Sequence, residues 1–312
     1  MDNDTREGAI ACVFPGQGAQ RVGMGQDLYS AYSEARQAFE EADEALGFTL
    51  SRLCFEGPEE ELAQTVNAQP AILTASIACL RVASQVAGGL ICPAFMAGHS
   101  LGEYTALVAA QVLDFGDAVR LTRERGRLMQ AAGERTPGGM AAIIGLDDVS
   151  IEEICQETGA QIANLNSPGQ IVVSGTRTAV ARAMDLARTM GAKHITALKV
   201  SGAFHSDLMQ PAAEGMAYAI SQLSLCAPQV PVVGNCTAQP VTTAEGVREE
   251  LIAQLCRPVQ WQRSVEFMAQ SGVSTFVELG PGQVLSGLIK RISREAEIVS
   301  VRDIETVDAL RS

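Results

Sequence analysis

The stretch GHSLGE at residues 98–103 constrains the fold more than any other part of the chain. The run AFMAGHS ends at its serine, and LGEYTALVAAQVL follows without a gap and is apolar on most faces. The first run predicts a short buried strand and the second a buried helix, so the chain must turn sharply at Ser100. Glycines relieve crowding at such a turn, and the first amides of the helix can help to bind an oxyanion. Ser100 is therefore a candidate nucleophile, with a helix-capping turn serine as the alternative.

Composition and charge narrow the class of protein. The 312 residues are enough for one large domain, or for a large domain that carries a smaller one. The formal charge of −13 disfavours nucleic acids and anionic membranes as partners, because both bind to basic surfaces. The start MDNDTREG lacks the basic and apolar parts of a signal peptide, and no run reaches the roughly 18 apolar residues of a membrane span. A cytoplasmic protein is expected.

No pattern in the sequence indicates a metal or a nucleotide cofactor. The eight cysteines include no C-x-x-C pair and no histidine cluster that would complete a zinc site, so they are expected to be reduced core residues. FPGQGAQ at 14–20 is not a dinucleotide loop, because Arg21 stands where G-x-G-x-x-G needs glycine. Small residues at this turn would instead let backbone amides approach an acyl oxygen. We expect neither a cofactor nor a metal.

The segment from about 137 to 204 differs in pattern from the rest. MAAIIGL reads as a strand, VSIEEICQETG as a helix, QIANLNS and QIVVSG as two strands, TAVARAMDLARTMG as a helix and KHITALKV as a last strand. The order β-α-β-β-α-β is that of a ferredoxin-like unit. We therefore predict an α/β fold, with a large α/β-hydrolase-like domain of residues 1–135 and 205–312. A small ferredoxin-like domain, residues 136–204, is inserted into it.

The flanking segments predict further strands and helices of the large domain. It should begin with a strand in GAIACVF, followed by helices at about 27–45 and 69–86. Asp114 is the expected N-cap of a helix that carries four arginines, at 120, 123, 125 and 127. Near the C-terminus, a helix at about 262–270 precedes the strand STFVEL and the helix QVLSGLIKRI.

A serine hydroxyl needs a positioned base, normally an imidazole, and the chain has three histidines. His99 adjoins Ser100, so its side chain should diverge from the serine and pack at the turn. His194 falls on the expected edge of the small domain. His205 falls where the chain re-enters the large domain, a common place for a cleft, and is the best candidate base, with a loop histidine of no role as the alternative. Asp207 should point elsewhere, so no Ser-His-Asp triad is predicted and a backbone carbonyl could orient the ring.

Seven motifs occur in the order found in one enzyme family. They are FPGQGAQ (14–20), GHSLGEY (98–104), RERGRLMQ (123–130), NLNSPGQIVVSG (164–175), SGAFHS (201–206), RPVQW (257–261) and VELGPGQVLSGL (277–288). Over nearly its whole length the chain resembles the malonyl-CoA:acyl carrier protein transacylases. These enzymes load malonyl groups in fatty acid synthesis and also occur as domains of polyketide synthases.

The resemblance implies roles for three charged or reactive residues. Ser100 would be the acylated serine and His205 its base, in agreement with the argument from the three histidines. Arg125 would hold the free malonyl carboxylate. A guanidinium can bind a carboxylate through two parallel hydrogen bonds, each contributing about 1.5 to 3 kcal/mol net. Without the resemblance, a solvent-exposed position would be as reasonable for any of the four arginines of this helix.

The resemblance also implies five residues around the substrate. The backbone amides of Gln17 and Leu101 would form the oxyanion hole. The carbonyl of Gln260 would hold the imidazole, which would explain the missing acid. Phe204 and Leu101 match the residues found at these positions in family members that select malonyl groups. Asn166 is expected to contact the substrate.

The expected reaction is a two-step transfer from malonyl-CoA to acyl carrier protein, performed by a monomer that binds neither nucleic acid nor membrane. The alternatives are a polyketide-pathway acyltransferase, a serine thioesterase or esterase, and a docking subunit without activity. Ser100, His205 and Arg125 are all present, which argues against the last. Because the carrier is acidic, a local basic patch is needed. Candidates are Arg182, Arg188, Lys193 and Lys199, or Lys290, Arg291 and Arg294, with scattered solubilising charges as the alternative.

Overall fold

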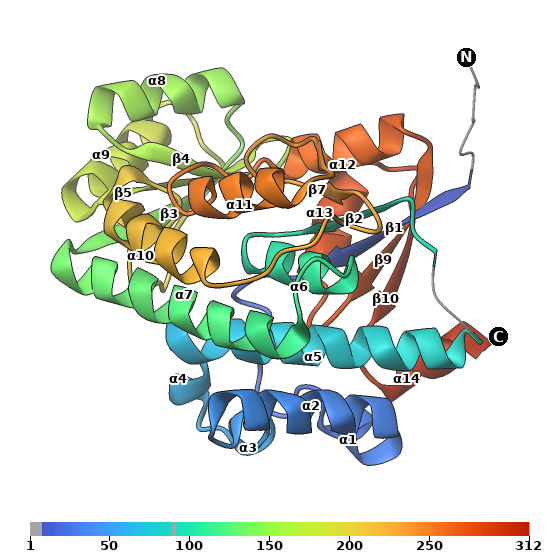
Figure 1. The fold of residues 1–312 in the computed structure, drawn as a ribbon. Coiled ribbons are helices and arrows are strands. Elements are labelled where there is room, and N and C mark those ends of the chain that lie inside the picture. The colour runs from blue at the N-terminus through green and yellow to red at the C-terminus, as the bar shows by residue number, and fades with distance from the viewer. Residues whose placement is uncertain (1–7, 89–91, 312) are drawn as a thin grey trace.

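A computed structural model describes residues 8–88 and 92–311, and Figure 1 shows its elements around two sheets. The acidic start, residues 1–7, on which the expected location depended, lies outside the described residues. The larger sheet has the order β10-β9-β1-β2-β7-β8 and is parallel except at β8. Its strands are β1 (Ala9–Phe14), β2 (Phe95–Gly98), β7 (Val232–Val233), β8 (Pro240–Val241), β9 (Val273–Leu279) and β10 (Glu297–Val301). The predicted α/β class is confirmed.

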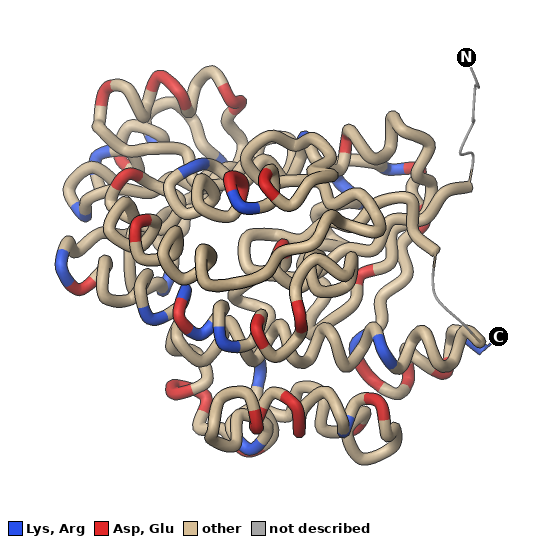
Figure 2. Tube along the Cα trace, in the orientation of Figure 1, with Lys and Arg blue, Asp and Glu red and all other residues tan. Residues whose placement is uncertain are grey.

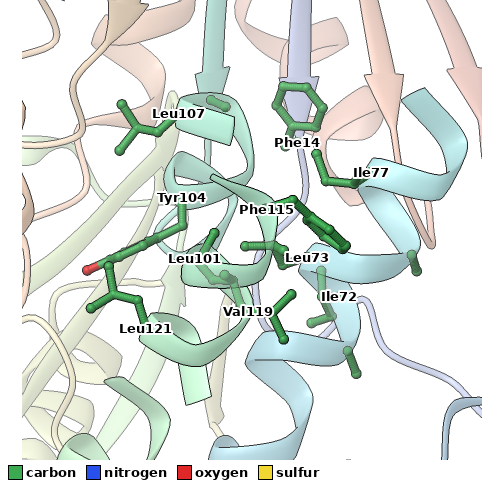
Figure 3. Packing of buried hydrophobic residues seen from close by; sticks show 14 of the residues in the cluster. Phe14, Ile72, Leu73, Ile77, Leu101, Tyr104, Leu107, Phe115, Val119 and Leu121 are labelled. Atoms are coloured by element: carbon green, nitrogen blue, oxygen red, sulfur yellow. The ribbon is translucent and has the colours of Figure 1, made fainter. Parts of the chain in front are cut away.

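Both faces of the larger sheet are buried, which explains why its strands read as continuous apolar runs. On β1, Cys12 and Phe14 face one core, while Ala11 and Val13 face a second core that contains Trp261. Figure 3 shows the first core, where Phe14 lies among side chains of three helices. These are α5 (Thr65–Val86), α6 (Leu101–Ala109) and α7 (Phe115–Arg135). The second core is covered by α12 (Trp261–Gln270) and α13 (Val284–Ile292).

The predicted helix at 27–45 is two helices. Tyr32 has extended backbone, with φ −125° and ψ 131°, and separates α1 (Gln26–Ala31) from α2 (Ser33–Leu46). The break lets Tyr29 pack edge-on against Phe39, with ring centroids 6.0 Å apart. Asp114 caps α7 as expected, since its side chain accepts from the Asp117 amide. The remaining helices of this part are α3 (Leu50–Glu56), α4 (Glu59–Leu62), α10 (Gln210–Ser221), α11 (Ala244–Ala253) and α14 (Ile304–Asp308).

The helix α5 is long and apolar enough to cross a membrane by length and composition alone. It is the one helix of the described residues with that property, and 83% of its most apolar window is buried inside the molecule. A core helix has the same character as a membrane span, because both are apolar all round. Its burial between α2 and α7 accounts for its composition.

The smaller sheet is antiparallel, in the order β4-β5-β3-β6. Its chain order is the predicted β-α-β-β-α-β: β3 (Gly138–Ile144), α8 (Asp148–Thr158), β4 (Gln161–Ser167), β5 (Gln170–Thr176), α9 (Arg177–Thr189) and β6 (His194–Ala197). The two helices contribute Ile151, Ile154, Val180 and Ala183 to a core of its own. The strand β4 joins it to the rest, because Leu165 and Val259 are linked by a backbone hydrogen bond of 2.9 Å.

Figure 2 shows charges of both signs on the surrounding helices and few on the central strands.

Candidate active site

The strand β2 and the helix α6 meet at Ser100 in a sharp turn, as the sequence predicts. Ser100 has φ 51° and ψ −102°, a backbone conformation that residues other than glycine rarely adopt. The turn needs glycine on both sides. A Cβ on Gly98 would lie 1.9 Å from the carbonyl carbon of Gly102, and one on Gly102 would lie 2.0 Å from the carbonyl oxygen of Phe14. The serine is thereby fixed at the carboxyl end of a central strand.

Asn235, which follows β7, supports this turn from the neighbouring strand. Its Oδ1 accepts from the Ser100 amide at 2.7 Å, and its Nδ2 donates to the Gly98 carbonyl at 2.7 Å. The Ser100 amide is therefore occupied. Within residues 8–88 and 92–311, the main-chain amides of Gln17 and Leu101 have no hydrogen bond to another group. Their assignment to the oxyanion hole stays a prediction.

His205 lies against the serine, as predicted for the base. The Ser100 hydroxyl donates to His205 Nε2 at 2.8 Å, and Nδ1 donates to the main-chain carbonyl of Gln254 at 2.8 Å. A carbonyl can only accept, so the proton of the neutral ring is on Nδ1 and Nε2 is free to act as base. Asp207 points away, as expected, and pairs with Gln161 through two hydrogen bonds of 2.8 Å.

The assignment of the Gln260 carbonyl to the imidazole is wrong. Gln260 is the N-cap of α12, and its carbonyl accepts from the amide and the hydroxyl of Ser264 at 2.9 and 3.0 Å. Gln254 instead stands at the end of α11, where carbonyls have no partner within the helix. Its carbonyl is therefore the one that can accept from His205.

Arg125 differs from the other arginines of α7 in being 1% exposed. Its Nη1 donates to Gln69 Oε1 at 2.8 Å, and its Nη2 donates to Ser100 Oγ at 3.2 Å and to Gln254 Oε1 at 2.7 Å. The guanidinium lies 5.3 Å from the centroid of the Tyr104 ring. No carboxylate of the described residues forms an ion pair with it. Arg120 and Arg127 pair with Asp117 and Glu124 at the surface, and Arg123 donates to Asn67 at 3.0 Å.

Burial and charge keep the base neutral. Burial, followed by the nearby Arg125 charge, lowers the pKa of His205 from 6.5 to about 3. Burial also lowers the pKa of Arg125 and that of His99. A neutral imidazole next to a hydroxyl, with a cation 3.2 Å from the same oxygen, favours loss of the serine proton because the cation stabilises the developing negative charge.

A cavity of about 310 Å³ opens onto this group. Ser100, Arg125 and His205 line its polar end, and Phe204, Met129 and Met140 are among its apolar lining. Gln17 also lines it, and its side-chain amide donates to Thr65 at 3.2 Å. Around it, the described residues hold no group of three or more His, Cys, Asp or Glu side chains suited to a metal ion.

His99 also lines the cavity, and Asn166 holds its ring. His99 Nε2 donates to Asn166 Oδ1 at 2.8 Å, and its ring lies 5.8 Å from that of Trp261. The expected packing role of His99 at the turn is confirmed, while Asn164 rather than Asn166 lines the cavity. His194 is exposed on the edge strand β6, as predicted.

Sequence reasoning missed four polar residues that hold the site: Gln69, Glu103, Asn235 and Gln254. Asn235 follows a strand beside β2, so a rule that examines the carboxyl ends of neighbouring parallel strands would have found it. No spacing identifies Gln254, because its role depends on where α11 ends in space.

Comparison with known proteins agrees with this geometry. A family model of the acyl transferase domain matches residues 11–307. The malonyl CoA-acyl carrier protein transacylase of Bacillus subtilis (strain 168) is 47% identical over 304 residues, which cover 96% of this chain and 95% of that protein. A crystal structure of an acyl carrier protein S-malonyltransferase from Vibrio cholerae is 45% identical, with a TM-score of 0.93 and coverage of 97% of this chain and 99% of that chain.

A third relative was solved with a partner. It is a malonyl-transacylase in complex with a type II PKS acyl-carrier protein, 44% identical, with a TM-score of 0.93 and coverage of 97% and 98% of the two chains. The match to the family model extends over nearly the whole chain, and so do the three relatives. The chain therefore belongs to the acyl transferase domain family and, within it, to the malonyl CoA-acyl carrier protein transacylases.

Proposed function

We propose that this protein transfers the malonyl group of malonyl-CoA to the phosphopantetheine thiol of acyl carrier protein, through a malonyl ester on Ser100. One observation carries the proposal: the buried Arg125 guanidinium donates to the Ser100 hydroxyl at 3.2 Å. A cation at this distance from an acylated serine would bind the free carboxylate of the malonyl group by charged hydrogen bonds. The names of the relatives support the same donor and acceptor.

In the first half-reaction, Ser100 gives its hydroxyl proton to His205 Nε2 as its oxygen attacks the thioester carbonyl of malonyl-CoA. The tetrahedral intermediate carries a negative oxygen, to which we assign the amides of Gln17 and Leu101. The carbon–sulfur bond then breaks, and His205 gives the proton to the coenzyme A sulfur. The malonyl ester of Ser100 remains, with its carboxylate held by Arg125.

The second half-reaction reverses these steps with a different thiol. The phosphopantetheine thiol gives its proton to His205 Nε2, and its sulfur attacks the ester carbonyl. The bond to the Ser100 oxygen breaks, the serine recovers the proton from His205, and malonyl leaves on the carrier. The Gln254 carbonyl, which accepts from Nδ1, stabilises the imidazolium that forms in each half.

The other substrate assignments rest on position. Phe204 lines the apolar part of the cavity, which supports contact with the acyl group. Asn166 holds His99, and we propose that it acts on the substrate through that ring. Lys199 is exposed and lines the cavity, which favours the basic set of residues 182–199 for carrier binding. Members of both sets already donate to other groups, such as Arg188 to Asp185 and Arg291 to Gln170, so the position of Lys199 at the cavity is what favours the first set.

We also propose the domain division of the sequence, with residues 1–135 and 205–312 as an α/β-hydrolase-like domain and residues 136–204 as an inserted ferredoxin-like domain. The strand order β4-β5-β3-β6 with α8 and α9 packed on it supports the second, and the turn at Ser100 supports the first. The nucleophile and base come from the chain itself, so the proposed steps need no cofactor. A cytoplasmic location and a monomeric state are part of the same proposal.

The test is the intact mass of the protein after brief mixing with malonyl-CoA and an acid quench. We expect a malonyl-sized increase on the parent and none on Ser100→Ala, and we expect discharge when acyl carrier protein is added. Release of free malonate without a carrier would support a thioesterase instead. A comparison of fatty acid carriers with polyketide carriers as acceptors distinguishes the two pathways. The proposal is rejected if no acyl donor forms an adduct with the parent protein.

A further inference from the structure

One buried glutamine contacts Arg125, His205 and the main chain of Ser100. Gln254 is fully buried at the end of α11. Its main-chain carbonyl accepts from His205 Nδ1 at 2.8 Å. Its side-chain Oε1 accepts from Arg125 Nη2 at 2.7 Å, and its Nε2 donates to the Ser100 carbonyl at 2.9 Å. The main chain of one residue therefore serves the base, while its side chain serves the cation.

The amide of Gln254 is held in one orientation by an acid. Its Nε2 also donates to Oε2 of Glu103, which is 1% exposed on α6. The other carboxylate oxygen accepts from the Asn235 amide at 3.2 Å. With both N–H groups directed to acceptors and the oxygen directed to a guanidinium, a flipped amide would place donors against Arg125. Glu103 therefore fixes which atom of Gln254 faces the cation.

This arrangement explains how a guanidinium can be buried without a carboxylate in contact. Burial and the nearby Glu250 raise the pKa of Glu103, whereas the attraction between Glu103 and Arg125 across the intervening amide lowers it and offsets part of the cost of burying the cation. The guanidinium stays available to another anion, since Arg125 lines the cavity beside Ser100. Glu250 is the other nearby buried acid, and it accepts from the Cys236 amide at 2.6 Å.

We propose that the Gln254 side chain, held by Glu103, is a positioning pair that sets Arg125 for the malonyl carboxylate and so determines the preference for malonyl over acetyl groups. The proposal rests on the proposed function. It separates two roles within Gln254: the main-chain carbonyl acts on every acyl donor through the base, and the side chain acts on carboxylated donors alone.

The decisive variant is Gln254→Met, which keeps the main-chain carbonyl and nearly the same length but loses three side-chain hydrogen bonds. Single-turnover loading is measured with malonyl-CoA and with acetyl-CoA over a range of concentrations. We expect malonyl loading to fall about 10- to 100-fold, chiefly through a higher KM, while acetyl loading changes by less than about threefold. Equal losses for both donors, or no loss for either, would overturn the proposal.

Three further variants complete the test. Glu103→Gln replaces one acceptor oxygen by a donor and should lower malonyl loading about fivefold with acetyl loading spared; it decides the matter if Gln254→Met does not fold. Thr74→Val is the matched control, because this buried hydroxyl donates within α5 to Pro70 and should leave both activities unchanged. In an Arg125→Ala background, Gln254→Met should have no further effect on malonyl loading. If the parent forms no malonyl adduct, the proposed function fails as well; if it does and the donor ratio is unchanged, this inference alone fails.

Discussion

The two sheets contribute to the cavity in different ways. The elements of the larger sheet bring Ser100, Arg125 and His205, of which Arg125 is 1% and His205 4% exposed. From the smaller sheet, β3 and β4 bring the buried Met140 and Asn164, and the segment after β6 brings Leu198 and Lys199, both of which are exposed. The reacting side chains therefore lie where the backbone is crowded, and the exposed side chains lie on the segment after β6. A transferase needs both, since it must fix one acyl group and admit two thiols in turn.

The largest effect is expected at the buried cation. Arg125→Ala should lower malonyl loading about 100-fold or more, because two charged hydrogen bonds of about 1.5 to 3 kcal/mol each would be lost. Acetyl loading, which needs no carboxylate partner, should be spared or improved. The rates are measured by quenched-flow mass spectrometry with both donors. Loss of both activities in a folded variant would show that Arg125 is needed for the reaction of every acyl donor, and not only for binding the malonyl carboxylate.

The next largest effect is on stability, and it is tested with one glycine at the turn after Ser100 and one in the smaller sheet. Gly102→Ala would place a Cβ 2.0 Å from the Phe14 carbonyl oxygen, so β1 or the turn must move, at a cost of about 3 kcal/mol. Gly139→Ala in β3 is the matched control, because nothing lies within 4 Å of its added Cβ, and the change should stay within about 1 kcal/mol of the parent. Urea unfolding measures both. Similar stability of the two variants would mean that the turn is no more crowded than the smaller sheet.

The same contrast explains what the sequence could predict. Local pattern suffices for Ser100, since the turn glycines, the apolar strand and the helix are consecutive. It suffices for the smaller sheet, whose helices and strands alternate along one continuous segment. It fails for Gln254 and Asn235, because their roles follow from the packing of α11 and β7 beside β2, far from Ser100 in sequence. It also fails for the break at Tyr32, which is set by aromatic packing rather than by helical periodicity.

A smaller effect concerns stability at acid pH. The pKa of His205 is lowered from 6.5 to about 3 in the folded protein, so between these values the unfolded chain binds a proton that the folded one does not. The free energy of unfolding should therefore fall as the pH falls through this window. From pH 7.5 to pH 4.5 this group should account for about 2.6 kcal/mol. Denaturant unfolding of the parent and of His205→Gln at both pH values measures it, and parallel losses in the two proteins would contradict it.

The smallest effect is expected at the mouth, where screening limits what one charge can do. Lys199→Glu should raise the KM for acyl carrier protein a few-fold at low salt, and the difference from the parent should shrink as salt is added. Arg52→Glu is the matched control, since Arg52 is paired with Glu56 on α3, belongs to neither candidate set and does not line the cavity. Malonyl loading is measured without carrier as well, which separates an effect on malonyl-CoA in the same cavity from an effect on the carrier. If the KM for the carrier shifts equally for both charge reversals, the effect comes from net charge. Lys199 would then have no specific role in carrier binding at the cavity mouth.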